Sequence, residues 1–491
     1  MTRKVSGRTL KTWPFLCVGL AAAIALTLGP ALAQDANAPR PTRIWGGHRV
    51  NPILSILPIL GGAVLAAPSA NAPPPQSGGG LAPSSGARVY RASPAKTVPP
   101  APKFVARAFP PPPGETRFRR GEILVEVSPA TPPAFVAQIV RRHRLVEQAV
   151  VSIALLGASV RLWRIPDARE VASVARELAF EPSLASIQPN YLYVAQQDAP
   201  AASTGAATAP SPPQYSLAKL HVDAVAAPAP AEPVRVAVID TAIDDSHPDL
   251  QGAIEARFDA IGGAAPPRTL EHGTSIAGAI AARGRLKGVD PNVRILSARA
   301  FDSEGAGPVG ETLWLLEAID WAARERASVV NMSFAGPPDP ALHAILAAAF
   351  AKGVTLVAAA GNAGPKSPPL YPAADERALA VTATDADDKL YPKANVGGYI
   401  AVAAPGVDVL LPAPQASYAL ETGTSVSAAL VSGVAALLIE RRPAATPTEI
   451  RAWLTSTAEP LGGGGRSDEF GAGLVDARRA VNAADAAKPT K

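Results

Sequence analysis

The sequence has 491 residues, which is long enough for two or three domains and a sizeable core. Its formal net charge is only +5, and the basic residues are not gathered into one stripe, so nucleic-acid binding is a poor first interpretation. Proline totals 52 and is concentrated before residue 115, which separates a proline-rich N-terminal part from a chain that can fold.

Residues 1–33 have the organisation of a signal peptide. Four cations form a positive n-region: Arg3, Lys4, Arg8 and Lys11. A short apolar core follows, and ALA at residues 31–33 supplies the small residues of a cleavage site. An uncut membrane anchor is the alternative, and the short core disfavours it. The sequence therefore predicts export to the periplasm or the medium, and cleavage would remove the single cysteine, Cys17.

Residues 34–115 are rich in proline, alanine and glycine, and we predict that they are disordered. They include one apolar stretch, NPILSILPILGGAVLAA at 51–67, which is short for a span and is broken by Pro58 and Gly61. It is a weak membrane anchor, an interfacial segment or of no consequence. Membrane association through 51–67 therefore stays open.

Residues 116–197 predict a small ferredoxin-like domain. The strand GEILVEVS, a helix, two strands around Gly157, a second helix and the strand SIQPNYLYVAQ follow in the order β-α-β-β-α-β. Asp167 is the expected N-cap of the second helix. The low-complexity segment 198–213 then reads as an exposed linker, where proteolysis is easy.

Residues 214–488 predict an α/β domain with a mainly parallel sheet and helices on both faces. Short apolar strands such as VRVAVID, VTLVAAAGN and YIAVAAPG alternate with helical stretches such as GETLWLLEAIDWAARER. In such a sheet, reactive side chains belong at the C-terminal ends of the strands.

Two candidates for catalysis lie early in this domain. Asp240 ends VRVAVID, where capping of a loop is the competing interpretation. His272 opens HGTSIAGAIAA, whose small residues allow a helix to pack closely and fix the imidazole. Each pattern is ambiguous alone.

Two more candidates lie further along. Ser425 stands at the start of the buried helix predicted for GTSVSAALVSGVAALL, where free N–H groups and the helix dipole favour negative charge. Simple capping of the helix is the alternative. Asn362 in AAAGNAG follows an apolar strand and offers an amide donor of the kind that an oxyanion hole needs.

Together, VAVIDTAIDDSHPDL, HGTSIAGAIAA, VVNMSFAGP, AAAGNAG and GTSVSAALVSGVAALL resemble the subtilisin-type serine proteases, or subtilases. The resemblance covers residues 214–488 and implies a serine endopeptidase that acts on polypeptides. It implies Ser425 as nucleophile, His272 as base, Asp240 as the residue that orients it, and Asn362 in the oxyanion hole.

The resemblance also implies a substrate cleft between two strands. One contains Ser333, Phe334, Ala335 and Gly336, and the other contains Gly305, Ala306 and Gly307. The domain at 116–197 resembles the inhibitor-type propeptide of the family, which implies a monomeric zymogen whose prodomain is its own intramolecular inhibitor until it is cut in the 198–213 linker.

The sequence departs from the family pattern at Ala242, Ala335 and Ala429, where glycine, glycine and proline are usual. Asp249 matches a calcium-binding carboxylate of many subtilases, but the segment ARGRLKGVDP is short and basic where further oxygen ligands are expected. We therefore predict no cofactor and no metal site, with calcium as the alternative. Rival functions are a catalytically silent binding protein on this scaffold and a surface-tethering protein.

Overall fold

The computed structural model describes residues 43–44, 107–196, 214–225, 232–262, 266–304 and 307–487. The chain divides into a unit of residues 1–41, none of which is described, and a unit of residues 42–491 that holds every element below. The predicted signal peptide, the apolar stretch 51–67 and the linker 198–213 lie outside the described residues.

The ferredoxin-like region has the predicted order of elements. The elements are β2 (Arg107–Ala108), β3 (Phe118–Val127), α1 (Pro133–Arg142), β4 (Val146–Ile153), the 3₁₀ turn η1 (Ala154–Leu156), β5 (Ala158–Arg164), α2 (Val171–Leu178) and β6 (Leu184–Ala195). The strand order β4-β5-β3-β6 is antiparallel throughout, and the short β1 (Arg43–Ile44) and β2 add parallel pairs to β4 and β6.

Side-chain alternation in β3 explains how this sheet is covered on both faces. Ile123 and Val125 share a core with α1 and α2. Leu124 instead joins a core of the α/β domain that contains residues of α5 (Thr312–Arg324) and α6 (Pro340–Ala351). One expectation is wrong: Glu170, without a side-chain cap, occupies the N-cap of α2. Asp167 is instead held in an ion pair by Arg169.

The α/β domain contains a seven-stranded sheet in which every pairing is parallel, in the order β16-β15-β14-β12-β7-β9-β8. Its strands are β7 (Arg235–Asp240), β8 (Ile254–Asp259), β9 (Arg294–Arg299), β12 (Val329–Met332), β14 (Thr355–Ala359), β15 (Ala378–Thr384) and β16 (Ile400–Pro405). Their residues are largely buried on both faces, as the continuous apolar runs predicted.

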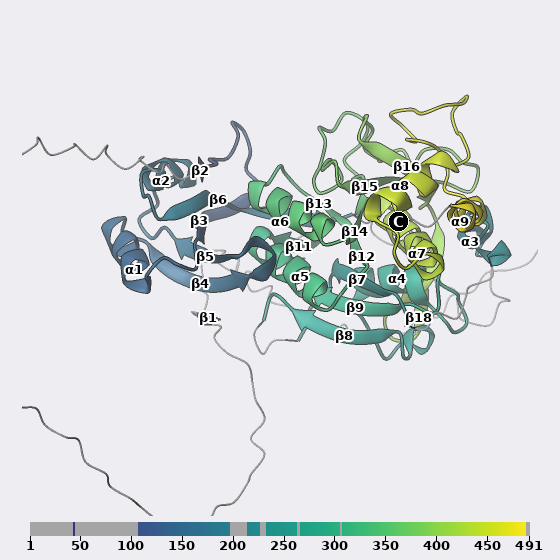
Figure 1. Cartoon of the computed structure of the whole chain (residues 1–491), viewed down its shortest axis with the longest axis horizontal. Helices are drawn as coiled ribbons and strands as arrows, with labels where there is room; N and C mark the ends of the chain where they lie inside the picture. Colours follow the sequence, from purple (N-terminus) through teal and green to yellow (C-terminus); the bar gives the residue numbers. More distant parts are fainter. Residues whose placement is uncertain are drawn as a thin grey trace, which may run out of the picture. The chain divides into compact units, whose positions relative to one another are not determined.

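Helices cover both faces of this sheet (Figure 1). They are α3 (Tyr215–Lys219), α4 (Glu271–Ala281), α5 (Thr312–Arg324), α6 (Pro340–Ala351), α7 (Thr424–Arg441), α8 (Pro447–Ser456) and α9 (Ala477–Ala486), with the 3₁₀ turns η2 (Val222–Ala224) and η3 (Pro248–Leu250). Val236 and Val238 of β7 point to the core of α4 and α7, and Ala237 and Ile239 point to the core of α5 and α6.

Helix α7 runs through the centre of the domain. It is the one described helix with the length and hydropathy of a membrane span, but 94% of it is buried inside the protein, so it is a core helix. Gly433 permits its close packing, because a β-carbon there would lie 2.5 Å from Val289. The helix is thus held firmly along its length, and its first turn is fixed with it.

The last residues of β6 leave the ferredoxin-like sheet and pair within the α/β domain. They pair with β11 (Gly307–Glu311) and β13 (Phe334–Ala335), both antiparallel, and β10 (Asp302–Glu304) extends the sheet beyond β11. A separate hairpin joins β17 (Val409–Ala413) to β18 (Ser417–Glu421). One strand therefore belongs to both regions of the chain.

Candidate active site

Asp240 and His272 come from neighbouring elements at the C-terminal edge of the sheet. Asp240 ends β7 and His272 is in the first turn of α4, and His272 Nδ1 lies 2.7 Å from Asp240 Oδ1. Gly273 allows this approach, because a β-carbon there would lie 2.6 Å from the Thr241 carbonyl oxygen. Burial opposes protonation of His272, but the charge of Asp240 outweighs it and raises the pKa of the imidazole.

Ser425 lies in the first turn of α7, as the sequence predicted. The helix begins at Thr424 after Gly423, and first-turn N–H groups have no acceptor within their own helix. Ser427, two residues on, donates instead to the carbonyls of Ala404 and Pro405. Only one of the two serines therefore has its hydroxyl free of structural bonds.

Asn362 follows β14 and is oriented by α7. Its Oδ1 accepts the hydroxyl of Thr424 at 2.8 Å and the Thr424 N–H at 3.1 Å, which fixes the direction of the amide. The amide nitrogen Nδ2 is turned away from these contacts. The sequence suggested the donor but not Thr424, the residue that aims it.

Three buried polar atoms at this edge have no hydrogen-bond partner among the described residues. They are His272 Nε2, Ser425 Oγ and Asn362 Nδ2. Buried polar atoms are nearly always paired, because an unmade hydrogen bond is costly. Three of them on residues of a candidate base, nucleophile and oxyanion donor are what a site prepared for a reacting group would contain.

A buried network behind Ser425 was not found from the sequence. Ser333 donates to the Ser425 carbonyl at 3.1 Å and to Asn331 Oδ1 at 2.9 Å, and Asn331 Nδ2 donates to Ser432 in α7. Ser333 was predicted to bind substrate through its strand. Its hydroxyl also ties that strand to the first turn of α7, so the strand and the candidate nucleophile are held in one register.

The predicted substrate strands lie on either side of β6. Ala335 pairs with Val194 from one side and Val309 pairs with Val194 from the other. Phe334 and Gly336 are in this cleft as well, and Gly307 begins β11, whereas Gly305 and Ala306 are outside the described residues. The methyl group of Ala335 does not prevent the backbone pairing.

The chain following β6 ends at the candidate nucleophile. The N–H of Gln196 donates to the Ser333 carbonyl at 3.0 Å, and its side-chain oxygen accepts the Asn362 N–H at 2.6 Å. A β-carbon on Gly423 would lie 2.4 Å from the Gln196 carbonyl oxygen, 3.0 Å from Asn362 Nδ2 and 3.2 Å from Ser425 Oγ. The carbonyl, amide and hydroxyl therefore converge around a space that only glycine at 423 leaves open, beside a cavity of about 420 Å³.

Polar contacts beyond the cleft also join the two regions. Arg119 of β3 forms ion pairs with Glu304 and Glu311, the last residues of β10 and β11. Asn190 Oδ1 accepts the N–H of Leu313 in the first turn of α5. The ferredoxin-like region thus accepts a free N–H group at the start of α5, and its last strand also lies in the cleft of the α/β domain.

Asp249, the candidate calcium ligand, has both carboxylate oxygens occupied by the chain itself. Oδ1 accepts the Arg285 N–H at 2.7 Å and Oδ2 accepts the Leu286 N–H at 2.9 Å. Gly284 is packed against the same carboxylate, where a β-carbon would lie 2.0 Å from Oδ1. The groups around this carboxylate are therefore backbone N–H donors and not the oxygen ligands that calcium takes. Among the described residues there is also no cluster of three or more metal-ligating side chains.

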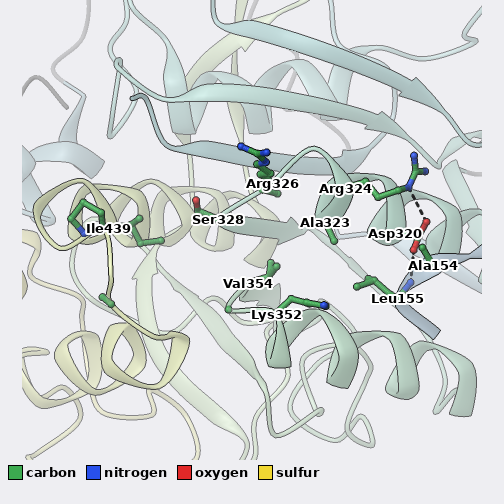
Figure 2. A pocket seen from close by; sticks show the side chains of 14 residues that line it. Ala154, Leu155, Asp320, Ala323, Arg324, Arg326, Ser328, Lys352, Val354 and Ile439 are labelled. Carbon is green, nitrogen blue, oxygen red and sulfur yellow. Dashed lines mark hydrogen bonds and ion pairs between the residues drawn. The ribbon is translucent and has the colours of Figure 1, made fainter. Parts of the chain in front are cut away.

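A larger cavity, of about 530 Å³, lies between the α/β domain and the turn η1 of the ferredoxin-like region (Figure 2). Ser328 and Val354 line it, immediately before β12 and β14, so it is at the N-terminal ends of the strands. Figure 2 shows Arg324 paired there with Asp320, which also accepts the N–H of Leu155. Because α/β sheets carry chemistry at the opposite ends of their strands, this cavity is not part of the candidate site.

Comparisons with known proteins agree with this geometry. A family model described as the subtilase family matches residues 232–473. A subtilisin of Bacillus pumilus is 34% identical over 261 residues, which are 50% of this chain and 90% of that protein. Subtilisin NAT of Bacillus subtilis subsp. natto is also 34% identical over 261 residues, with 50% and 65% of the two chains covered, so the chain spans less than two thirds of that relative's length.

Two further relatives extend the match toward the N-terminus. The minor extracellular protease Epr of Bacillus subtilis is 32% identical over 308 residues, which are 61% of this chain and 47% of that protein. Among solved structures, fervidolysin from Fervidobacterium pennivorans, a keratinolytic enzyme related to subtilisin, matches with a TM-score of 0.65. It covers 77% of this chain and 63% of its own at 23% identity, which is a likeness of fold.

Proposed function

The chain belongs to the subtilase family, and on that premise we propose that it is an exported serine endopeptidase made as a self-processing zymogen. One observation carries the proposal. The Asp240–His272 bond lies at the same edge of the sheet as three buried polar atoms that have no partner among the described residues. Two of these atoms, Ser425 Oγ and Asn362 Nδ2, border the space beside Gly423 together with the Gln196 carbonyl oxygen.

Each of these residues has a role in the proposed hydrolysis of a peptide bond. Ser425 Oγ attacks the scissile carbonyl carbon while His272 Nε2 accepts its proton. Asp240 holds the Nδ1–H tautomer and stabilises the imidazolium. The negative oxygen of the tetrahedral intermediate is stabilised by Asn362 Nδ2 and by the Ser425 N–H at the start of α7.

Collapse of the intermediate breaks the C–N bond, and His272 gives its proton to the leaving amine. A water molecule then attacks the acyl-enzyme with His272 as the base, which releases the acid and restores the Ser425 hydroxyl. Polypeptide substrates would enter as the end of β6 does, by antiparallel pairing with β11 and β13.

The ferredoxin-like region would act as the prodomain and as an intramolecular inhibitor. Its last strand fills the cleft, and the Gln196 carbonyl lies at the nucleophile, so the first cut should follow Gln196. That bond lies just before the 198–213 linker that the sequence suggested. This arrangement favours inhibition, because the end of β6 would keep its place between β11 and β13 after the cut and so exclude a substrate strand.

We propose that this family loop needs no calcium, because backbone N–H groups already satisfy Asp249. Export is proposed from the predicted signal peptide and from a relative named as an extracellular protease.

The test compares the full chain with Ser425→Ala, and with Ser427→Ala as a matched control. The control removes a neighbouring hydroxyl that bonds only to backbone carbonyls, so it should still process itself. We expect the wild type and the control to be cut, to be labelled by a fluorophosphonate, and to give a fragment that ends at Gln196 by mass spectrometry.

The Ser425→Ala chain should stay whole and unlabelled. If it is cut like the wild type in a protease-free background, the proposal of self-processing is wrong. If the wild type is not labelled at all, the chain is a silent binding protein on this scaffold.

A further inference from the structure

The fourth residue of the cleft-bound segment, counted back from Gln196, is Tyr193. Backbone pairing fixes it there: Gln196 bonds to Ser333, and Tyr193 pairs with Gly310 of β11. In the function proposed above, a substrate follows the same path, so the pocket around Tyr193 receives the fourth residue before the scissile bond.

The walls of this pocket are shaped for an aromatic ring. Tyr193 is completely buried, and its ring meets Phe334 edge-on with centroids 5.7 Å apart. Phe334 is in turn 5.0 Å from Phe301. Gly336 forms the floor, since a β-carbon there would lie 2.4 Å from the tyrosine ring. Aromatic edge-to-face contacts of this kind favour a planar side chain over an aliphatic one.

The inner end of the pocket is polar. The Tyr193 hydroxyl donates to Asp339 Oδ2 at 2.9 Å, and Thr312 donates to the same oxygen at 2.7 Å. Asp339 Oδ1 accepts the N–H groups of Ala341 and Leu342 and so caps α6. Asp339 is thus a buried carboxylate fixed by its own domain, with one oxygen directed at the substrate side chain.

Two donors to Asp339 belong to the ferredoxin-like region and would leave with it. They are the Tyr193 hydroxyl and the Gln188 amide, the latter at 2.7 Å from Oδ1. Thr312 and the two N–H groups would remain. Asp339 Oδ2 would then lack one donor. A bound tyrosine can supply that donor through its hydroxyl, and a bound phenylalanine cannot.

We propose that Asp339 is a specificity-determining residue that selects a tyrosine hydroxyl at the fourth position before the scissile bond. A site built to bond a hydroxyl rejects the analogue that lacks it, because the buried carboxylate oxygen then keeps only one of its two donors, Thr312. A cationic side chain is the competing occupant of a pocket with a carboxylate. The positive N-terminal end of α6 and the Thr312 hydroxyl already offset the Asp339 charge, and the aromatic walls suit a ring.

The experiment uses the processed full chain and three peptides that differ only at this position, with tyrosine, phenylalanine or arginine. We expect kcat/KM to favour tyrosine over phenylalanine by about 10- to 100-fold, the range for a hydrogen bond to a charged group. Arginine should be the poorest of the three.

The variant Asp339→Asn is the matched control. Asparagine caps a helix as well as aspartate does, so α6 should begin normally. The tyrosine preference should shrink to about threefold or less, because the asparagine oxygen stays with the α6 cap and the Nδ2 group that replaces Oδ2 cannot accept the tyrosine hydroxyl. The phenylalanine peptide should be hydrolysed faster than by the wild type, because a neutral amide facing the phenylalanine ring costs less than a carboxylate that lacks a donor.

Equal rates for tyrosine and phenylalanine in the wild type, a preference for arginine, or an unchanged preference in Asp339→Asn would each overturn this inference alone. Hydrolysis of none of the peptides, together with no fluorophosphonate labelling, would overturn the proposed function and this inference with it.

Discussion

Asp240 and Asp249 are buried aspartates nine residues apart in the same stretch of sequence, and they have opposite surroundings. Asp240 bonds to His272, and three polar atoms at that edge, on His272, Ser425 and Asn362, have no hydrogen-bond partner among the described residues. Asp249 accepts the N–H groups of Arg285 and Leu286, one on each oxygen. Asp240 is therefore bonded to a residue whose other ring nitrogen has no partner among the described residues, whereas Asp249 holds the 285–286 segment in place.

The difference separates a site that waits for a ligand from one that is complete. A buried donor or acceptor without a partner lowers the stability of the fold. Such a group is retained where it bonds to a substrate or a reaction intermediate. A carboxylate that accepts a backbone N–H on each oxygen contributes stability and needs no cation or substrate to complete its hydrogen bonds. The four predictions below test this distinction, beginning with the largest effect.

The first prediction concerns Asp240→Asn, which should lower kcat by about 10⁴-fold, because asparagine favours the wrong imidazole tautomer. Asp240 holds the pKa of His272 up against burial, so its loss should also lower that pKa. The base must be neutral to act, so the acid limb of the kcat/KM profile should move to lower pH. A profile that stays in place, or moves to higher pH, would remove Asp240 from the mechanism.

The second prediction concerns Asn362→Leu, which should lower kcat by about 10²–10³-fold through loss of one oxyanion donor. Leucine also leaves the Thr424 N–H without its acceptor, so part of the effect could come from folding. Asn362→Asp is the control, because it keeps an acceptor for Thr424 and replaces only the free donor. A comparable loss of kcat in both variants, with normal thermal unfolding of the aspartate variant, assigns the effect to catalysis; an active aspartate variant contradicts it.

The positions of the four candidate residues could be predicted from the sequence, because each one lies at or just after the end of a strand or in the first turn of a helix, within a recognisable motif. The sequence also predicted the parallel sheet, since apolar runs such as VRVAVID have few other uses. Asp249 was more difficult, because its amide donors come from residues 36 and 37 positions later in the chain. The prediction of no metal site rests on the short, basic segment ARGRLKGVDP, and the chelator experiment below tests it.

The supporting residues could not be predicted, because their contacts link distant segments without a local signal. Ser333 bonds to Ser425 across 92 positions, and Gln188 bonds to Asp339 across 151. Asp167 illustrates the reverse error. Aspartate is a residue type that often caps helices, but the Asp167 carboxylate is bound by Arg169 two residues later. The helix starts at Val171, and Asp167 does not cap it.

The third prediction concerns Asp249→Asn, measured in a Ser425→Ala background to prevent self-digestion. One amide N–H should lose its acceptor, which costs about 2 kcal/mol of the free energy of unfolding. For a domain of this size that is a fall in Tm of about 4–8 °C. A chelator should leave the Tm of the parent unchanged. A large fall with chelator would mean that calcium, and not the backbone, stabilises this region.

Gly284→Ala is the second variant for the same loop, because its methyl group would displace the Asp249 carboxylate. It should lower Tm in the same direction. In an active background, both variants should keep the kcat of the folded fraction. A loss of kcat in either one would place Asp249 on the functional side of the comparison.

Asp290 and Glu440 test whether unpaired atoms always mark chemistry. Both are buried and face each other near the end of α7, and Asp290 Oδ2 and both Glu440 oxygens have no donor among the described residues. Burial, and then the charge of Asp290, raise the pKa of Glu440 well above its ordinary value. A proton shared by the two carboxyl groups would pair Asp290 Oδ2 with one of the Glu440 oxygens. These oxygens therefore lack donors because two acids face each other, and not because a ligand is missing.

The fourth prediction is that Glu440→Gln stabilises the protein, increasingly so as the pH rises. The folded state holds a proton that unfolded Glu440 releases above its ordinary pKa, so the free energy of unfolding of the parent falls as pH rises from about 4.3 through the raised pKa. Glutamine keeps a neutral donor opposite Asp290 at every pH. In a Ser425→Ala background, its Tm should match the parent near pH 5 and exceed it by about 2–4 °C at pH 9, equivalent to about 1 kcal/mol. The exposed Glu469→Gln should show no such divergence. A Glu440→Gln variant that is less stable at both pH values would mean that the carboxylate binds a cation, and that unpaired atoms here do await a ligand.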